Sequence, residues 1–145
     1  MGYASRRIDP LANAKFCIEV ENIQEAAFTE ASGLEAEVEV FEYQEGGNNF
    51  FTHKLPGRAK FPNVVLKRGV TTSNELWEWF EKSMYRKTER RNISIVLYNQ
   101  EGEEVRRWNL TNAYPVKWTG PSFRAGDNAV TIEAVEFAHE GMSPQ

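Results

Sequence analysis

The sequence is poor in the residues that most often carry catalysis or hold metals. It has one cysteine, Cys17, and two histidines, His53 and His139, among 145 residues. A single cysteine excludes an intrachain disulfide, so packing must stabilise the fold. Neither histidine has a cysteine or second histidine at ligand spacing, which excludes a structural zinc site by ligand count. The sequence after His139 also lacks the HExxH pattern of zinc proteases.

Long apolar runs are missing as well. Nothing approaches the ~20 consecutive apolar residues of a membrane-spanning helix, so no membrane segment is predicted. Arg6-Arg7 precedes no apolar core of a secretory signal, so we expect synthesis in the cytoplasm and any export by another route. The formal net charge of -4 provides no general attraction for nucleic acid.

Acidic and glycine-rich motifs fit structural roles better than chemical ones. Glu35, Glu37 and Glu39 alternate with apolar residues, which favours a solvated or lumen-facing stripe over calcium ligands or a glycosidase pair. Gly46-Gly47 lacks the spacing of a phosphate-binding loop and follows an acidic residue. We therefore assign no catalytic, cofactor-binding or metal-binding residue.

One basic cluster could suggest nucleic-acid binding. Arg86, Lys87, Arg90 and Arg91 follow a predicted helix, where cations suit the negative end of the helix dipole. No exposed aromatic residues accompany them at the spacing that base stacking requires. The cluster favours a structural role.

Alternating apolar and polar residues predict a mainly β fold. Phe16, Ile18 and Val20 share one face of a strand that begins at Lys15. We expect one domain, 1–145, built as a β-barrel or sandwich of about six to eight antiparallel strands with one packed helix. Residues 1–14 are predicted to be an N-terminal arm. The other expected strands are 26–31, 34–44, 63–67, 91–98, 103–110, 114–119 and 127–139.

The single helix is predicted at about 73–86. Thr72 and Glu75 have the spacing of a capping box, in which each side chain satisfies a backbone donor. Trp79 falls beside the main apolar stripe, so an exposed Trp79 would mark an interface. The stripe expected to face the core is Leu76, Trp77, Phe80 and Met84.

Two strands change their apolar face midway. In 34–44, Val38 lies on the apolar face, whereas Phe41 falls on the face of the glutamates. Ile132 and Val135 are on opposite faces of the last strand. Because side chains alternate with a period of two, each change predicts a bulge or a strand whose two ends have different neighbours. Such strands are expected in a sheet that continues from one subunit to the next, and not in a closed monomeric barrel.

The connection 44–62 is the least usual part of the chain. It has no hydrophobic period, and compact domains rarely contain structureless connections that long unless these are functional or disordered. Phe50, Phe51, Leu55 and Phe61 make it too apolar for a disordered segment. An ordered aromatic loop that a small domain cannot bury predicts a protein partner.

Five sequence blocks occur in a distinctive order between about residues 9 and 141. They are SGLEAEVEVFEYQEGGNN, KLPG, NVVLKRG followed by ELWEWF, RRWNLTNAYPVKWTGP, and AVTIEAVEFAHEG. Together they resemble the tail tube protein family of contractile phages and phage-like contractile injection systems. The set of blocks, taken in order, makes this resemblance specific.

The resemblance implies a structural protein without enzymatic activity or cofactor. Hexameric rings with a continuous lumen sheet would stack into a hollow inner tube, which conducts DNA or protein cargo when a surrounding sheath contracts. The implied partners are further copies, the sheath protein, and baseplate and terminal cap proteins. The particle would be a phage virion tail or a cytoplasmic, membrane-anchored or extracellular injection particle. The alternative is a small monomeric β-barrel that binds or carries a ligand.

The resemblance also implies roles for particular residues. The segment 44–62 would be an extended inter-subunit loop that reaches adjacent rings. A polar lumen would keep cargo from sticking, and the hypothesis is that Glu35, Glu37 and Glu39 help to line it. The residues expected in the inter-subunit loop are Glu45, Gly46, Gly47, Asn48, Phe50, Phe51, Lys54, Leu55, Pro56 and Gly57.

Overall fold

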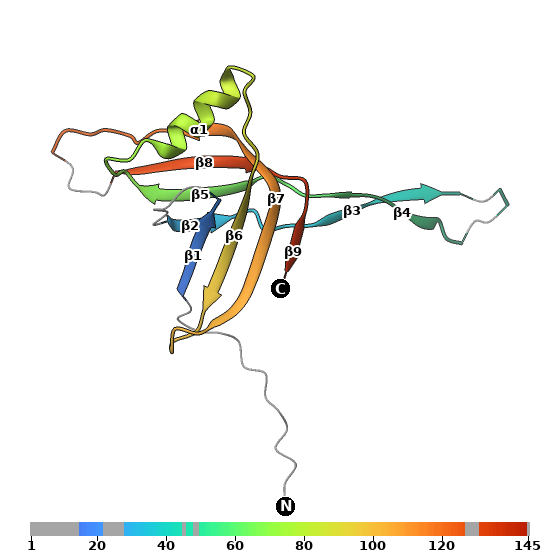
Figure 1. Cartoon of the computed structure of the whole chain (residues 1–145). Helices are drawn as coiled ribbons and strands as arrows, with labels where there is room; N and C mark the ends of the chain where they lie inside the picture. The colour runs from blue at the N-terminus through green and yellow to red at the C-terminus, as the bar shows by residue number, and fades with distance from the viewer. Residues whose placement is uncertain (1–14, 22–27, 45, 48–49, 127–130, 145) are drawn as a thin grey trace, which may run out of the picture.

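The computed structural model describes residues 15–21, 28–44, 46–47, 50–126 and 131–144. These residues form nine strands and one helix (Figure 1), which confirms the mainly β fold with a single helix. The predicted N-terminal arm lies outside the described residues. The elements are β1 (Lys15–Val20), β2 (Phe28–Ser32), β3 (Glu37–Tyr43), β4 (His53–Lys60), β5 (Val64–Gly69), α1 (Glu75–Met84), β6 (Arg91–Tyr98), β7 (Glu104–Thr119), β8 (Ile132–Ala138) and β9 (Met142–Pro144).

Seven of the strands form one open, bent antiparallel sheet. Its order is β1-β6-β7-β8-β5-β2, and β9 pairs with β7 beside this path. Within the described part of the chain, β1 and β2 each pair with one strand and so form the two ends of the order. Within the described residues the body is therefore an open sheet and not a closed barrel.

Strand β7 carries the sheet around a corner. Its first half pairs with β6 and β9, and its second half pairs with β8. The sequence predicted two strands here, but the structure has one strand of 16 residues that bends at Asn112. Asn112 has a φ of 50°, a conformation that asparagine adopts more readily than most residues. The Asn112 backbone N–H donates to Asn92 Oδ1 at 3.1 Å, and its side-chain amide donates to Glu140 Oε2 at 2.9 Å.

The corner brings the two halves of the sheet across each other, as Figure 1 shows. Strands that switch sheets at a bend make the corners of orthogonal β packings. The core fills the space between these halves and α1, and α1 itself contacts β7. The core residues are Ile18, Val20, Val64, Leu66, Leu76, Trp79, Ile93, Ile95, Leu110, Ala113, Val135 and Phe137.

The buried face of α1 differs from the predicted stripe. Trp79 is only 1% exposed, whereas Met84 is 49% exposed. The Trp79 ring packs against Phe137 with centroids 5.0 Å apart, and its indole N–H donates to the Glu89 carbonyl at 2.6 Å. A buried tryptophan needs such an acceptor. The expectation that Trp79 lies off the core face is wrong, because α1 turns its Leu76–Trp79 side toward the sheet.

The start of α1 also differs from the prediction. The N-cap residue is Asn74, not Thr72, and it makes no side-chain capping hydrogen bond. The Glu75 backbone N–H instead donates to Ser73 Oγ at 3.4 Å. The predicted capping box is therefore wrong. Acidic residues in the first turn still suit the positive end of the helix dipole.

A buried ion pair explains the irregular pattern of β8. Glu133 lies on the same face as Val135, where it is 8% exposed and its Oε1 accepts a hydrogen bond from Arg68 Nε at 2.5 Å. Trp118 Nε1 donates to the other carboxylate oxygen at 3.3 Å. The ladder to β5 is regular from residue 132 to residue 137, so the described strand keeps its face. Ile132 is 44% exposed and Val135 is buried, so the two lie on opposite faces as predicted, but no bulge separates them. Val130, which shares the predicted face of Ile132, lies outside the described residues.

We predict that Glu133→Leu destabilises the subunit by about 3–5 kcal/mol, because Arg68 then stays buried without its partner. Adding Arg68→Met to that variant should recover most of the loss, since two well-packed apolar side chains replace the pair. Urea unfolding followed by circular dichroism measures both variants. A double variant as unstable as Glu133→Leu alone would contradict this account.

Candidate assembly surface

A two-stranded hairpin leaves the body of the subunit. Strands β3 and β4 pair with each other in a separate sheet of two strands, and Figure 1 shows them projecting beyond one end of the main sheet. The prediction that 44–62 lacks regular structure is therefore wrong for its second half, because His53–Lys60 is a strand. Its sequence, HKLPGRAK, hides the strand because proline, glycine and charged residues are uncommon in strands.

The ladder of the β3–β4 hairpin is irregular, but its extra residue is in β4 and not in the strand for which the sequence predicted a bulge. The register shifts between Val38 and Val40, where β4 contributes one residue more than β3. Gly57 lies next to this bulge, and a Cβ there would lie 2.6 Å from Cε2 of Phe41. Glycine therefore lets the Phe41 ring lie against β4. Pro56 is tolerated because a two-stranded sheet leaves one side of each strand without a ladder partner.

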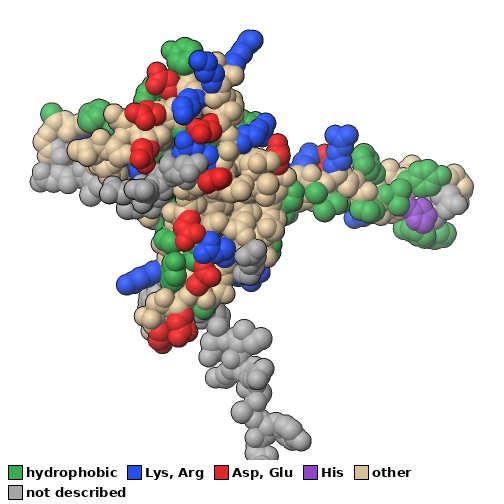
Figure 2. All heavy atoms as spheres, in the orientation of Figure 1, with side chains coloured by type: hydrophobic (Ala, Val, Ile, Leu, Met, Phe, Trp, Pro, Cys, Tyr) green, Lys and Arg blue, Asp and Glu red, His purple; other side chains and the backbone are tan. Residues whose placement is uncertain are grey.

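Both faces of the β3–β4 hairpin expose apolar side chains. Phe50 is 95% exposed, and Figure 2 shows apolar side chains clustered along the projecting part of the molecule. Burial of one large apolar side chain contributes about 1.5–3 kcal/mol, so the isolated subunit forgoes on the order of 5–10 kcal/mol here. The others, each more than half exposed, are Val38, Val40, Phe41, Tyr43, Phe51 and Leu55.

The residues predicted for the inter-subunit loop divide between a turn and a strand. Gly46 and Gly47 lie in a turn near the tip, and Gly47 has a φ of +91° that favours glycine. Lys54–Gly57 lie within β4 and face β3. Glu45 and Asn48 are outside the described residues. The structure thus places the described members of this set in one projecting element.

The three candidate lumen glutamates lie at the base of that element. Glu37 and Glu39 are on β3, and Glu35 comes before it. Glu35 and Glu37 are exposed, and Glu39 is half-buried. The Lys60 ammonium lies 2.7 Å from Glu39, and this hydrogen bond raises the pKa of Lys60 above its ordinary value. None of the three carboxylates is in the core.

A second polar surface covers the outward face of β1, β6 and β7. Arg107 bridges Glu19 at 2.7 Å and Glu104 at 2.6 Å, and the hydrogen bond to Glu19 contributes most to a raised pKa of Arg107. Ser94 and Asn109 share a hydrogen bond of 2.7 Å. This surface was not among the sequence predictions, although the residues between the inward-facing isoleucines of β6 were the available signal.

Both histidines contact neighbouring residues of the subunit. The two ring nitrogens of His139 lie 3.2 Å from the carbonyl oxygens of Gly141 and Pro62. His53 lies edge-on to Phe51 with ring centroids 4.9 Å apart. Among the described residues, no group of three or more His, Cys, Asp or Glu is placed to hold a metal ion. No described helix has the length and apolar character to cross a membrane.

Two cations of the predicted basic cluster are held by carboxylates. Arg90 pairs with Glu140 at 2.8 Å, and Arg91 pairs with Glu89 at 2.9 Å. The hydrogen bond from Arg91 contributes most to a lowered pKa of Glu89. Arg91 also lies over the Trp79 ring, 4.9 Å from its centroid. The contact between Arg91 and Trp79 joins β6 to α1, which fits the structural role.

Comparison with known proteins shows the family. Residues 12–143 match the model of the T4-like virus tail tube protein gp19 family. The chain belongs to this family. It is therefore a structural tail tube protein and not an enzyme.

Solved structures of contractile injection systems contain similar chains. A chain in the cryo-EM structure of the anti-feeding prophage cap, which terminates its tube, is 30% identical, with a TM-score of 0.85 over 94% of this chain and 91% of that chain. A chain in the extended sheath–tube complex of the extracellular contractile injection system PVC is 29% identical, with a TM-score of 0.84 over 94% and 91%. A chain in the six-fold symmetrised anti-feeding prophage baseplate is 29% identical, with a TM-score of 0.84 over 94% and 96%. A comparison with curated proteins finds no match.

We predict that Gly57→Ala loosens the β3–β4 hairpin of this tail tube protein without affecting its body. The new methyl group would crowd Phe41, and overpacking of this kind costs about 1–3 kcal/mol. Amide hydrogen exchange should become faster in β3 and β4 and stay unchanged in β5 and β8. Gly46→Ala is the matched control, because no atom of a described residue lies within 4 Å of its added Cβ. Equal effects of the two substitutions would contradict the crowding at Gly57.

Proposed function

We propose that this tail tube protein is the subunit of the inner tube of a contractile tail or injection particle. Its copies form hexameric rings, and the rings stack into a hollow tube that conducts DNA or protein cargo when the sheath contracts. The observation that carries the proposal is the β3–β4 hairpin, whose exposed aromatic and aliphatic side chains extend beyond the subunit's own core.

Copies of the same chain are the partners that this hairpin requires. An exposed apolar strand pair is a hazard for aggregation unless it is covered. A two-stranded hairpin alone is also marginally stable in water. A contact repeated from copy to copy covers each hairpin and generates an extended assembly from one kind of subunit. This is the inter-subunit role proposed for Phe50, Phe51 and Lys54–Gly57.

The open ends of the main sheet allow neighbouring subunits to join into a ring. Strands β1 and β2 each pair with one described strand, so their outer edges can join neighbouring subunits into a continuous sheet. Cyclic symmetry then closes every edge. The six-fold symmetrised baseplate that contains a similar chain supports a hexamer.

The partners proposed beyond the tube are the sheath, the baseplate and the terminal cap. Similar chains occur in structures of a sheath–tube complex, a baseplate and a tube-terminating cap. These similarities favour an injection particle among the places where the subunit could work. Cargo would pass through the lumen without specific binding, and Glu35, Glu37 and Glu39 would help to line it.

A monomeric carrier is the alternative function, but the fold does not favour it. The described strands form an open sheet rather than a closed barrel with a ligand cavity. The β3–β4 hairpin projects away from the sheet and does not fold back over it as a lid (Figure 1).

We predict that the purified protein forms rings or tubes in negative-stain electron microscopy. Replacing Phe50 and Phe51 with serine should abolish stacking while leaving the melting temperature of the subunit unchanged, because both side chains are exposed in the subunit. Tyr85→Ser is the matched control, since Tyr85 is 69% exposed at the far end of α1. Unfolding of the Phe50/Phe51 variant would place these side chains in the subunit's core, and a strictly monomeric wild type would favour the carrier.

The lumen assignment has its own test. In a cryo-EM map of the assembled tube, the carboxylates of Glu35, Glu37 and Glu39 should face the channel. A map that instead lines the channel with the polar face of β1, β6 and β7, around Arg107, would overturn this assignment while leaving the tube function intact.

A further inference from the structure

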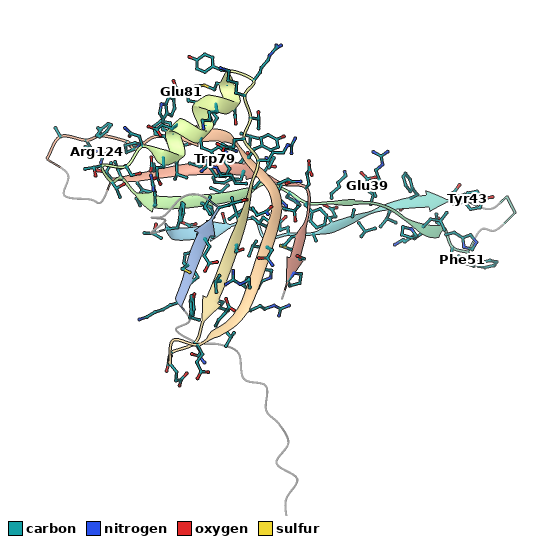
Figure 3. The ribbon with its side chains drawn as sticks, viewed as in Figure 1. Glu39, Tyr43, Phe51, Trp79, Glu81 and Arg124 are labelled. Atoms are coloured by element: carbon teal, nitrogen blue, oxygen red, sulfur yellow. The ribbon has the colours of Figure 1, made fainter. Side chains whose placement is uncertain are left out.

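A pocket lies at the opposite end of the subunit from the β3–β4 hairpin. Its volume is about 290 Å³. Strand β5 begins four residues after β4 ends and leads away from the hairpin to Gly69, directly before the pocket residue Val70. Figure 3 shows Tyr43 and Phe51 at one end of the molecule and Arg124, in the loop that follows β7, at the other. The lining residues that matter below are Val70, Asn74, Trp77, Trp118, Pro121 and Glu133.

The walls of the pocket are aromatic. Trp77 and Trp118 meet edge to face with ring centroids 5.0 Å apart. Val70, on the rim, is 48% exposed. An apolar cavity of about 150 Å³ is large enough for a benzene ring, so this pocket has room for a phenylalanine side chain. Aromatic walls favour a further ring, which adds about 0.5–1.5 kcal/mol beyond the area it buries.

The charge in the pocket is already neutralised. Glu133 accepts hydrogen bonds from Arg68 on one oxygen and from Trp118 on the other. The pocket therefore does not require a cationic ligand. The edge of a phenyl ring carries partial positive charge, which suits a carboxylate oxygen at the floor of an aromatic pocket.

We propose that this pocket receives the Phe50 side chain of another copy of the chain. Among the described residues, Phe50 is the most exposed large apolar side chain, at 95%. The chain's own Phe50 cannot enter, because β3 and β4 extend away from the pocket and β5 separates the two ends. The contact joins the hairpin of one subunit to the opposite end of the next, a head-to-tail interface that repeats without limit. This proposal rests on the proposed tube function, for which it identifies the contact between rings.

Cysteine crosslinking tests the proposal in the full chain. Cys17 is the only cysteine, so Cys17→Ser provides a background for Phe51→Cys together with Val70→Cys, a pair that leaves the Phe50 side chain in place. A disulfide forms where Cα atoms come within about 4.4–6.8 Å. Mild oxidation of assembled material should convert monomer into a ladder of dimers, trimers and longer covalent chains. The control pairs Phe51→Cys with Tyr85→Cys, at the far end of α1, and should stop at dimers through Phe51→Cys alone.

The outcomes separate this proposal from the tube function. Electron microscopy of the same samples before oxidation shows whether tubes are present. Tubes without a ladder, or a ladder equally long in the control, would overturn the pocket contact and leave the tube function standing. Failure of the unmodified chain to form rings or tubes would overturn both. Circular dichroism of each variant verifies that the subunit is folded.

Discussion

The central constraint on this structure is that the apolar β3–β4 hairpin lies outside the core of the subunit. The bent sheet and α1 close around one core, and none of the described hairpin residues contributes to it. Side chains on both faces of the hairpin are apolar and more than half exposed. Exposure of this apolar surface to water is unfavourable in free energy, so we expect another protein to cover it. For a member of the tail tube family, a second copy of the same chain is the simplest cover.

The body of the subunit is built to hold this hairpin in a defined direction. Strand β7 bends at Asn112 and so belongs to both halves of the sheet. The buried pair of Arg68 and Glu133 then ties β5 to β8 near the far end of the sheet. Buried ion pairs add little stability over apolar residues of similar volume. In this subunit the pair also connects β5 to Trp118 at the end of β7, through the indole hydrogen bond to Glu133.

The parts of the fold that were predictable have strong local patterns. Strand β6 begins and ends where its alternation predicted, and the turn at Asn99–Gly102 closes with a backbone hydrogen bond of 3.1 Å. The change of apolar face along β3 was also readable, but the bulge opposite Val38–Val40 lies in β4 and did not follow from the pattern of β3. Strand β4 was hidden by its proline, glycine and charges. Strand β9 was missed because it has three residues and ends in proline.

The sequence by itself determined the class of protein, its mainly β character and the presence of an apolar segment that needs a partner. These depend on composition, on periodicity and on motifs that are contiguous in the chain. Tertiary structure decided that the segment is a hairpin, that Trp79 rather than Met84 is buried, and that Glu133 has Arg68 as its partner. Each of these depends on residues far apart in the chain meeting in one place, and the local pattern of a single strand or helix carries no record of its distant neighbours.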